Sequence, residues 1–308
     1  MHIYGIIYIV LTSLHFLLTY TCLYECDHCF LYCEPYSEGT FTIDQVEKAL
    51  SQAVEAGISS IYIEGGEPFL YYPLMLEALR IAKKHKLLTG IVTDCYFALS
   101  ERDAELWLKP IVEIGLDSLS VSDDVFHSED VDNSPAKVAV KAALKLGMDV
   151  GTICIEKPIS IPKINGEAGQ PVVGGDVRFI GRAVDKLTQG LPRRHFESFD
   201  ECPHEKLDEP ERVHLDPFGN MFVCQGLSIG NIWKKPLKKI MDDYQPDRHP
   251  IIGPLLKGGP AELARQFGLP ENENYVDHCH LCYLIRKKLI DRFPEYLCPK
   301  QVYGIKEE

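Results

Sequence analysis

The sequence contains no long run of basic residues. Its 32 lysines and arginines are outnumbered by 45 aspartates and glutamates, which gives a formal net charge of −13. A protein that binds a nucleic-acid backbone usually presents a basic face to the phosphates. The charge therefore argues against a nucleic-acid partner.

The chain also lacks the marks of a targeting or membrane segment. Its apolar start, MHIYGIIYIVLTSLHFLLTY, has neither the basic beginning nor the small-residue cleavage site of a signal peptide. As a membrane span it would be interrupted by Thr12, Ser13 and His15. We expect an N-terminal extension of residues 1–13, then a buried first strand, and no membrane partner.

Cysteine, in contrast, is abundant. Eleven cysteines gather toward the two ends of a 308-residue chain that is 45% hydrophobic and can form a sizeable core. Disulfide frameworks usually belong to small secreted chains with a signal peptide. Metal or cluster ligation in a reducing compartment is the better interpretation, so we expect a cytoplasmic protein.

Short apolar runs alternate with helical patterns through the first part of the chain. Strands are predicted near residues 15–20, 60–64, 88–93, 117–122, 149–155 and 176–180. Such alternation indicates parallel strands joined by helical crossovers, in an open sheet or a barrel. The first four cysteines and the segments GGEP, TDC and SDD all fall at the carboxyl ends of strands, where α/β folds place their sites.

The alternation stops beyond about residue 190. A hairpin is predicted to turn at Asp216–Asn220, and a Cys-x-x-Cys pair opens a helix at Cys279. We therefore predict a core of residues 14–190 and a small cysteine-rich α+β domain of residues 191–308. The Pro- and Gly-rich segment 156–176 is either an active-site lid or a plain surface loop.

Cys22, Cys26 and Cys29 have the spacing Cys-x3-Cys-x2-Cys at the end of the first strand. Three thiolates on a cluster of four irons leave one iron open to a small molecule. Structural zinc would need a fourth protein ligand. Cys33 or His28 could supply it, so the spacing alone does not exclude zinc.

The motif CLYECDHC, followed about forty residues later by GGEP at the end of the second strand, resembles the radical S-adenosylmethionine (SAM) superfamily. The resemblance implies a partial (β/α)6 TIM-type barrel, with Cys22, Cys26 and Cys29 holding a 4Fe-4S cluster whose open iron binds SAM. It further implies reductive cleavage of SAM to a 5′-deoxyadenosyl radical, which abstracts hydrogen from a substrate. A ferredoxin- or flavodoxin-type protein would supply the electron.

Several other positions match cofactor-contacting segments of that superfamily. They are His28 beside the third cysteine, the glycine turn with its acid, and the end of the fourth strand: His28, Gly65, Gly66, Glu67, Ser120, Ser122 and Asp123. A helix or turn cap is the alternative role for Ser122 and Asp123. Two cysteines depart from the pattern: Cys33 is extra, and Cys95 stands where the family commonly has Asn-Gly.

The second cysteine group resembles the SPASM and twitch auxiliary-cluster domains of the superfamily. Gly219-x4-Cys224, then GNIW and Cys279-x2-Cys282, carry this resemblance, but two further cysteines of the full SPASM pattern are missing. It implies one auxiliary 4Fe-4S cluster on Cys202, Cys224, Cys279 and Cys282, with Cys298 in reserve. A zinc site on the same thiolates is the alternative.

These features predict a radical SAM oxidoreductase or maturase. The favoured substrate is a peptide or protein side chain, and a small metabolite is the alternative. The competing hypothesis from another class is a non-catalytic zinc or iron–sulfur binding protein.

Overall fold

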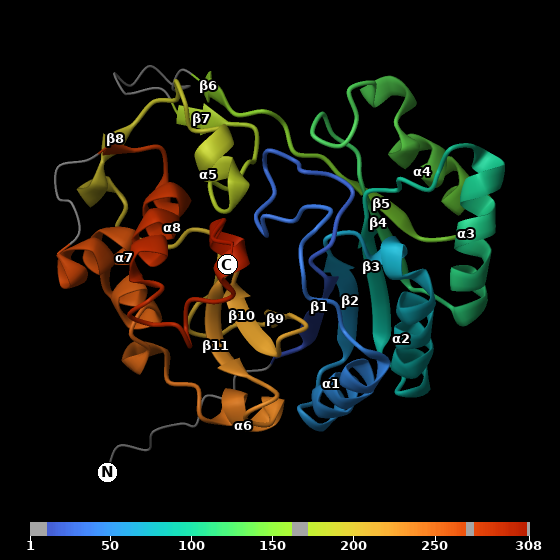
Figure 1. Ribbon diagram of the computed structural model, residues 1–308, viewed down its shortest axis with the longest axis horizontal. Coiled ribbons are helices and arrows are strands. Elements are labelled where there is room, and N and C mark those ends of the chain that lie inside the picture. The colour runs from blue at the N-terminus through green and yellow to red at the C-terminus, as the bar shows by residue number, and fades with distance from the viewer. Residues whose placement is uncertain (1–10, 162–171, 269–273, 307–308) are drawn as a thin grey trace, which may run out of the picture.

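The computed structural model describes residues 11–161, 172–268 and 274–306. Its centre is an eight-stranded, mostly parallel sheet in the order β11-β10-β9-β1-β2-β3-β4-β5 (Figure 1). The order is linear, so the sheet is open. Its strands are β1 (Ser13–Thr19), β2 (Ser60–Gly65), β3 (Leu88–Thr93), β4 (Ser118–Ser122), β5 (Val150–Ile153), β9 (Arg212–Leu215), β10 (Asn220–Cys224) and β11 (Leu227–Asn231).

Four helices connect the parallel strands β1 to β5 and lie together along one side of the sheet (Figure 1). They are α1 (Ile43–Glu55), α2 (Tyr72–Lys84), α3 (Glu101–Ile114) and α4 (Pro135–Lys145). Local chemistry fixes where they begin. Thr42 and Gln45 form a capping box at α1, and Ser100 and Ser134 cap α3 and α4. The mixed α/β class and the parallel core predicted from the sequence are confirmed.

The remaining elements are short or belong to the later part of the chain. The helices are α5 (Arg182–Lys186), α6 (Leu237–Asp242), α7 (Ile252–Phe267) and α8 (His278–Leu289). Two small antiparallel pairs join β6 (Ile159–Ile161) to β7 (Val172–Gly174) and β8 (Arg194–His195) to β12 (Asn274–Tyr275). Single 3-10 turns occur at η1 (Pro68–Tyr71), η2 (Val131–Asn133), η3 (Phe196–Ser198), η4 (Pro246–Arg248) and η5 (Lys300–Tyr303).

The strand predicted at residues 176–180 does not form. Asp176 and Gly181 both have positive φ angles, and the segment between them runs as an irregular connection into α5. Its apolar residues Phe179 and Ile180 are buried, which explains why the segment resembles a strand in sequence. The sixth parallel strand is β9, which pairs with β1 from Ser13↔Arg212 to Phe16↔Leu215.

The hairpin predicted at Asp216–Asn220 is confirmed between β9 and β10. The Asp216 side chain accepts hydrogen bonds from the Asn220 backbone N–H and side-chain amide, at 2.8 and 3.0 Å. Gly219 supplies the positive φ of 86° that closes the turn. The main sheet therefore runs without a break across the boundary predicted near residue 190.

Two sequence expectations fall partly outside the described residues. Of the predicted extension 1–13, residues 1–10 are not described, while Leu11 is buried in the core and Ser13 already belongs to β1. Of the segment 156–176, residues 162–171 are not described. Among the helices of the described ranges, none combines the length and apolarity needed to cross a bilayer.

Candidate functional site

A cavity of about 300 Å³ lies at the carboxyl ends of the parallel strands. Cys22, Cys26 and Cys29 all line it, and they come from the loop between β1 and α1. The sheet contributes residues from one of its faces: Leu17 pairs with Glu64 in the register of β1 and β2, and Ser122 pairs with Ile153 in that of β4 and β5. Parallel strands thus bring residues distant in sequence to one chamber, as the alternation predicts.

Backbone N–H groups point at two of the three sulfurs. Tyr24 donates to Cys22 Sγ at 3.4 Å, and Cys33 donates to Cys29 Sγ at 3.3 Å. The hydrogen bonds from Cys33 lower the pKa of the Cys29 thiol to about 6, against the effect of burial. Burial instead raises the pKa of Cys22. Cys29 is therefore prepared to act as a thiolate by its own loop.

Residues at the start of helix α5 hydrogen-bond to the backbone of the cysteine loop. The buried guanidinium of Arg182 donates to the backbone oxygens of Cys26 at 2.9 Å and Cys33 at 2.7 Å. Its backbone N–H donates to the Cys29 oxygen at 3.0 Å. At Gly181 an added Cβ would lie 2.5 Å from that same oxygen, so only glycine allows the approach. Arg182 is not among the site residues predicted from the sequence.

The glycine turn after β2 closes against the start of the same loop. Gly66 N–H donates to the Thr19 oxygen at 2.7 Å, and Glu67 N–H donates to the Thr21 oxygen at 2.9 Å. Gly65 has a φ of 134°, and a Cβ on Gly66 would overlap the Thr21 carbonyl. Gly65 and Gly66 both line the cavity, where their exposed backbone leaves room for a ligand.

Glu67 does not line the cavity. Its fully buried carboxylate accepts hydrogen bonds from Phe69 N–H, Thr93 Oγ1 and Asp94 N–H, at 2.9, 2.9 and 2.7 Å. These contacts tie the turn after β2 to the end of β3. Burial, together with the neighbouring Asp94 carboxyl, raises the pKa of Glu67 well above its usual range. Glu67 as a direct cofactor ligand stays a prediction.

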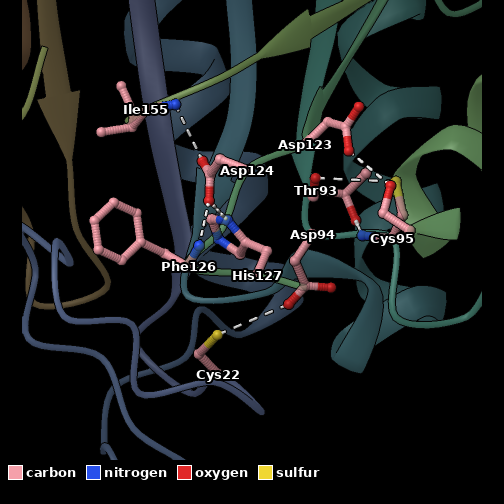
Figure 2. A network of polar contacts seen from close by, with 10 residues as sticks. Cys22, Thr93, Asp94, Cys95, Asp123, Asp124, Phe126, His127 and Ile155 are labelled. Carbon is pink, nitrogen blue, oxygen red and sulfur yellow. Dashed lines mark hydrogen bonds and ion pairs between the residues drawn. The ribbon is translucent and has the colours of Figure 1, made fainter. Parts of the chain in front are cut away.

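Asp94 does line the cavity, and its only mark in the sequence is its place in the TDC segment. Its Oδ2 lies 3.9 Å from Cys22 Sγ. Figure 2 marks this contact between the two side chains. Burial raises its pKa. The next residue, Cys95, is buried with its thiol toward the Thr93 oxygen and does not line the cavity, in keeping with a structural cysteine.

A histidine pair and an aspartate form another wall. Buried Asp124 accepts hydrogen bonds from His127 Nδ1 at 2.8 Å, Phe126 N–H at 3.0 Å and Ile155 N–H at 3.3 Å (Figure 2). Burial opposes protonation of His127, but Asp124 and the Cys26 sulfur together outweigh it and raise the pKa of His127 to about 10. Burial lowers the pKa of neighbouring His28 to about 4. The wall therefore presents one neutral and one charged imidazole.

The three residues predicted around the fourth strand have separate positions. Ser122 lines the cavity. Ser120 is paired with Val92 one layer deeper and is not part of the lining. Asp123 accepts a hydrogen bond from Ser134 Oγ at 2.6 Å, which links it to the N-cap of α4. Asp123 thus contacts the residue that caps α4 without capping the helix itself, and its role as a cofactor contact stays a prediction.

The four cysteines of the second predicted group lie near one another. Burial raises the pKa of the Cys279 thiol, and Asp277 and the thiols of Cys224, Cys282 and Cys202 raise it further. Fully buried Arg286 donates to the Gln225 oxygen at 2.9 Å and hydrogen-bonds the Cys282 thiol. The groups that chiefly shift the pKa of Cys298 are different ones, among them Asp216 and Ser228.

Comparison with known proteins adds a family match. Residues 16–158 match the model of the radical SAM superfamily, which is just under half of the chain and includes the first three cysteines and the glycine turn. Among curated proteins none matches the chain.

Two solved structures are similar to the chain. One is BtrN in complex with AdoMet and 2-DOIA, with 14% identity, a TM-score of 0.46, and coverage of 75% of this chain and 81% of that one. The other is methylornithine synthase (PylB), with 16% identity, a TM-score of 0.36, and coverage of 46% of this chain and 44% of that one.

Proposed function

We propose that the chain is a radical SAM enzyme, in which Cys22, Cys26 and Cys29 hold a 4Fe-4S cluster beside the bound SAM. The observation that carries the proposal is the convergence of these three cysteines and the Gly65–Gly66 turn on one cavity. The family match over residues 16–158 supports it independently of the geometry.

The spacing of the sulfurs favours a cluster over a single ion. Thiolates bound to one zinc ion at about 2.3 Å lie about 4 Å apart. In the described part of the chain, the groups of three donor atoms within 4.8 Å of one another include none of Cys22, Cys26 and Cys29. A cube does not require three donors around one ion, because it offers each thiolate its own iron. The residues present therefore fit the implied cluster.

The bound cluster and SAM together would supply a carbon-centred radical, by reductive cleavage of the sulfonium, that removes a hydrogen atom from the substrate. The protein's own residues position and shield these groups. The N–H groups of Tyr24 and Cys33 stabilise thiolate charge, and the Gly65–Gly66 backbone lets a ligand approach closely. His28 lies 4.5 Å from Phe126, ring to ring, which offers an aromatic wall for a purine.

The charge of the cavity also suits SAM. Acidic residues on its wall outnumber its cations, with Glu64, Asp94, Asp124 and Asp176 against Arg178 and the charged His127. SAM carries a sulfonium and an ammonium beside a single carboxylate. An acidic wall therefore complements its net positive charge.

We further propose that Cys202, Cys224, Cys279 and Cys282 hold a second 4Fe-4S cluster. The effects of these thiols on the pKa of Cys279 support the grouping, and Cys298 is absent from the groups that chiefly shift that pKa. The same distance argument disfavours zinc, because no group of three close donors in the described residues contains two of these cysteines. Four thiolates would close the cluster, which suits a structural or electron-relay role, with a ferredoxin- or flavodoxin-type donor.

The substrate that we favour is a peptide or protein side chain. A second cavity of about 470 Å³ shares Asp176, Val177 and Arg178 with the first and extends toward Arg194 and His204. Together the two spaces offer more room than SAM and a small metabolite would need, so they suit a longer substrate such as a peptide. A small molecule remains the alternative substrate.

Anaerobic reconstitution tests the proposal. We expect brown protein with about eight irons per chain, four for each cube, that forms 5′-deoxyadenosine from SAM when dithionite is added. Cys26→Ala should lower this rate by at least about 100-fold, because losing even an outer partner of a metal site costs about 10–100-fold. Cys154→Ala is the matched control, since Cys154 is exposed and outside the cavity.

Two results would contradict the proposal. One is bound zinc in place of iron, with no cleavage of SAM. The other is an undiminished rate of 5′-deoxyadenosine formation in the Cys26→Ala variant.

A further inference from the structure

Three adjacent parallel strands bring two histidines and a glutamate together beneath the cavity. His15 of β1 lies opposite Tyr62 of β2 on one side and His214 of β9 on the other. Glu64 stands two residues further along β2, nearer the carboxyl ends, and lines the cavity itself. One donor atom from each of His15, Glu64 and His214 lies within 4.8 Å of the other two.

The contacts within this cluster are short and enclosed. His214 Nδ1 lies 2.7 Å from Glu64 Oε1, and His15 Nδ1 lies 3.2 Å from Glu64 Oε2. The side chains of His15, Glu64 and His214 are only 16%, 15% and 10% exposed. Tyr62 stacks on the His15 ring at 5.0 Å, and the two histidine rings lie 4.9 Å apart.

One nitrogen of the cluster has no hydrogen bond. His15 Nδ1 is buried and lacks a hydrogen-bond partner within the described structure, although a carboxylate oxygen is 3.2 Å away. Its geometry relative to Glu64 does not suit donation. A buried polar atom without a partner costs about 1–3 kcal/mol, so such atoms call for a ligand or another explanation.

The donor atoms of the cluster suit a cation. A buried carboxylate beside two imidazole nitrogens is a donor set that suits zinc, manganese or iron.

We propose that His15, Glu64 and His214 bind a divalent transition-metal ion at the floor of the cavity. Three protein ligands leave coordination positions open, and Glu64 directs the site toward the chamber. The ion would take an oxygen or nitrogen donor of a molecule bound there. This site uses no cysteine and goes beyond the proposed radical chemistry.

Two other groups of close donors are weaker candidates. His28, Asp124 and His127 adjoin the cluster loop, and Asp124 is already saturated by His127 and two backbone N–H groups. His204, Asp277 and Cys279 include an exposed histidine and a cysteine of the second group. His28 Nδ1 of the first of these groups is also buried without a hydrogen-bond partner. We prefer the cluster of His15, Glu64 and His214 because, within the described residues, its carboxylate accepts no backbone N–H and the cluster includes no cysteine.

The test uses the anaerobically reconstituted protein, whose cluster cysteines are occupied, freed of loose metal by gel filtration. Mn²⁺ is titrated while its free form is followed by electron paramagnetic resonance, and Co²⁺ is titrated by visible absorption. We expect about one ion of each per chain, and a cobalt spectrum without thiolate charge-transfer bands. His214→Ala and Glu64→Gln should weaken binding at least about tenfold.

His85→Ala is the matched control, because it removes an exposed histidine at the end of α2. Glu64→Gln nearly preserves shape, and the visible absorption of the iron–sulfur clusters reports that each variant is folded. The proposal is overturned if the wild-type protein retains neither ion, or if Glu64→Gln binds as well as the wild type. It is also overturned if His127→Ala abolishes binding while His214→Ala does not. Formation of 5′-deoxyadenosine is measured separately, so failure here is distinguishable from failure of the radical SAM proposal.

Discussion

At the scale of single residues, Arg182 determines the shape of the cysteine loop. Hydrogen bonds from a charged group are worth about 1.5–3 kcal/mol each, and Arg182 makes two through its guanidinium. Arg182→Ala should therefore lower the free energy of unfolding by about 3 kcal/mol and reduce the iron bound at the first site. Arg182→Lys should lie between, because an ammonium cannot span both carbonyls in the fork geometry.

Denaturant midpoints and iron content measure both effects. Arg80→Ala is the control, since its exposed ion pair with Glu77 is worth under about 1 kcal/mol. Equal losses of stability and of iron in the Arg182 and Arg80 variants would show that the hydrogen bonds from Arg182 to the cysteine loop contribute to neither.

His249 makes stability depend on pH. Its Nδ1 accepts hydrogen bonds from the backbone N–H groups of Ile251 and Ile252 at 3.2 and 3.1 Å, so Nε2 carries the proton and donates to the Ser228 oxygen. Burial lowers the pKa of His249 to about 4. Between about pH 6.5 and pH 4 the unfolded chain binds the extra proton and the folded chain does not. Stability should therefore fall as the pH decreases through that window.

His249→Asn keeps an acceptor near the position of Nδ1 and removes the titration. The free energy of unfolding, from denaturant titrations at pH 7.5, 6.0 and 5.0, should decline less in this variant than in the wild type, by about 2 kcal/mol at pH 5.0. Parallel declines in the two proteins would assign the pH dependence to other groups.

At the scale of elements, the turn after β2 depends on the absence of a side chain at Gly66. Gly66→Ala would force Cβ into the Thr21 carbonyl, and overpacking of this kind costs about 1–3 kcal/mol. Because the same backbone faces the cavity, we expect SAM affinity to fall at least about tenfold, as measured by equilibrium dialysis. Gly151→Ala in β5 is the control, since a Cβ there meets open space. An unchanged SAM affinity in the Gly66→Ala protein would show that the turn does not contribute to SAM binding.

Elements set by local chemistry were predictable from the sequence, and those set by distant pairing were not. The Thr42–Gln45 capping box, the Asp216–Asn220 hairpin and the helix opening at His278 each depend on residues a few positions apart. The choice of β9 over residues 176–180 as sixth strand depends on a partner in β1 that no local pattern encodes. For the same reason Arg182, Asp94 and the His15–Glu64–His214 cluster emerge only once the chain is folded.

At the scale of the whole molecule, the two cysteine groups should behave as separate metal centres. Cys282→Ser should lower the iron content from about eight to about four per chain. The visible absorption should fall in proportion, while iron on the first three cysteines stays. Cys298→Ser is the matched control and should retain all of the iron, because Cys298 is not among the groups that chiefly shift the pKa of Cys279. Equal iron loss in both variants would show that the four ligands we propose for the second cluster are wrong.

The pairing of β9 with β1 also bears on how the protein is made. The Thr12 hydroxyl donates a hydrogen bond to the backbone oxygen of Glu211, which lies 199 residues later in the chain. On the ribosome, the first strand must wait with one side unpaired until that late segment emerges, and an unpaired edge readily recruits other chains. During synthesis the edge of β1 is therefore exposed to aggregation for a long time, and a chaperone that binds nascent chains would have its largest effect in that period. Recombination that exchanged its C-terminal third for that of a relative would replace part of the core sheet itself.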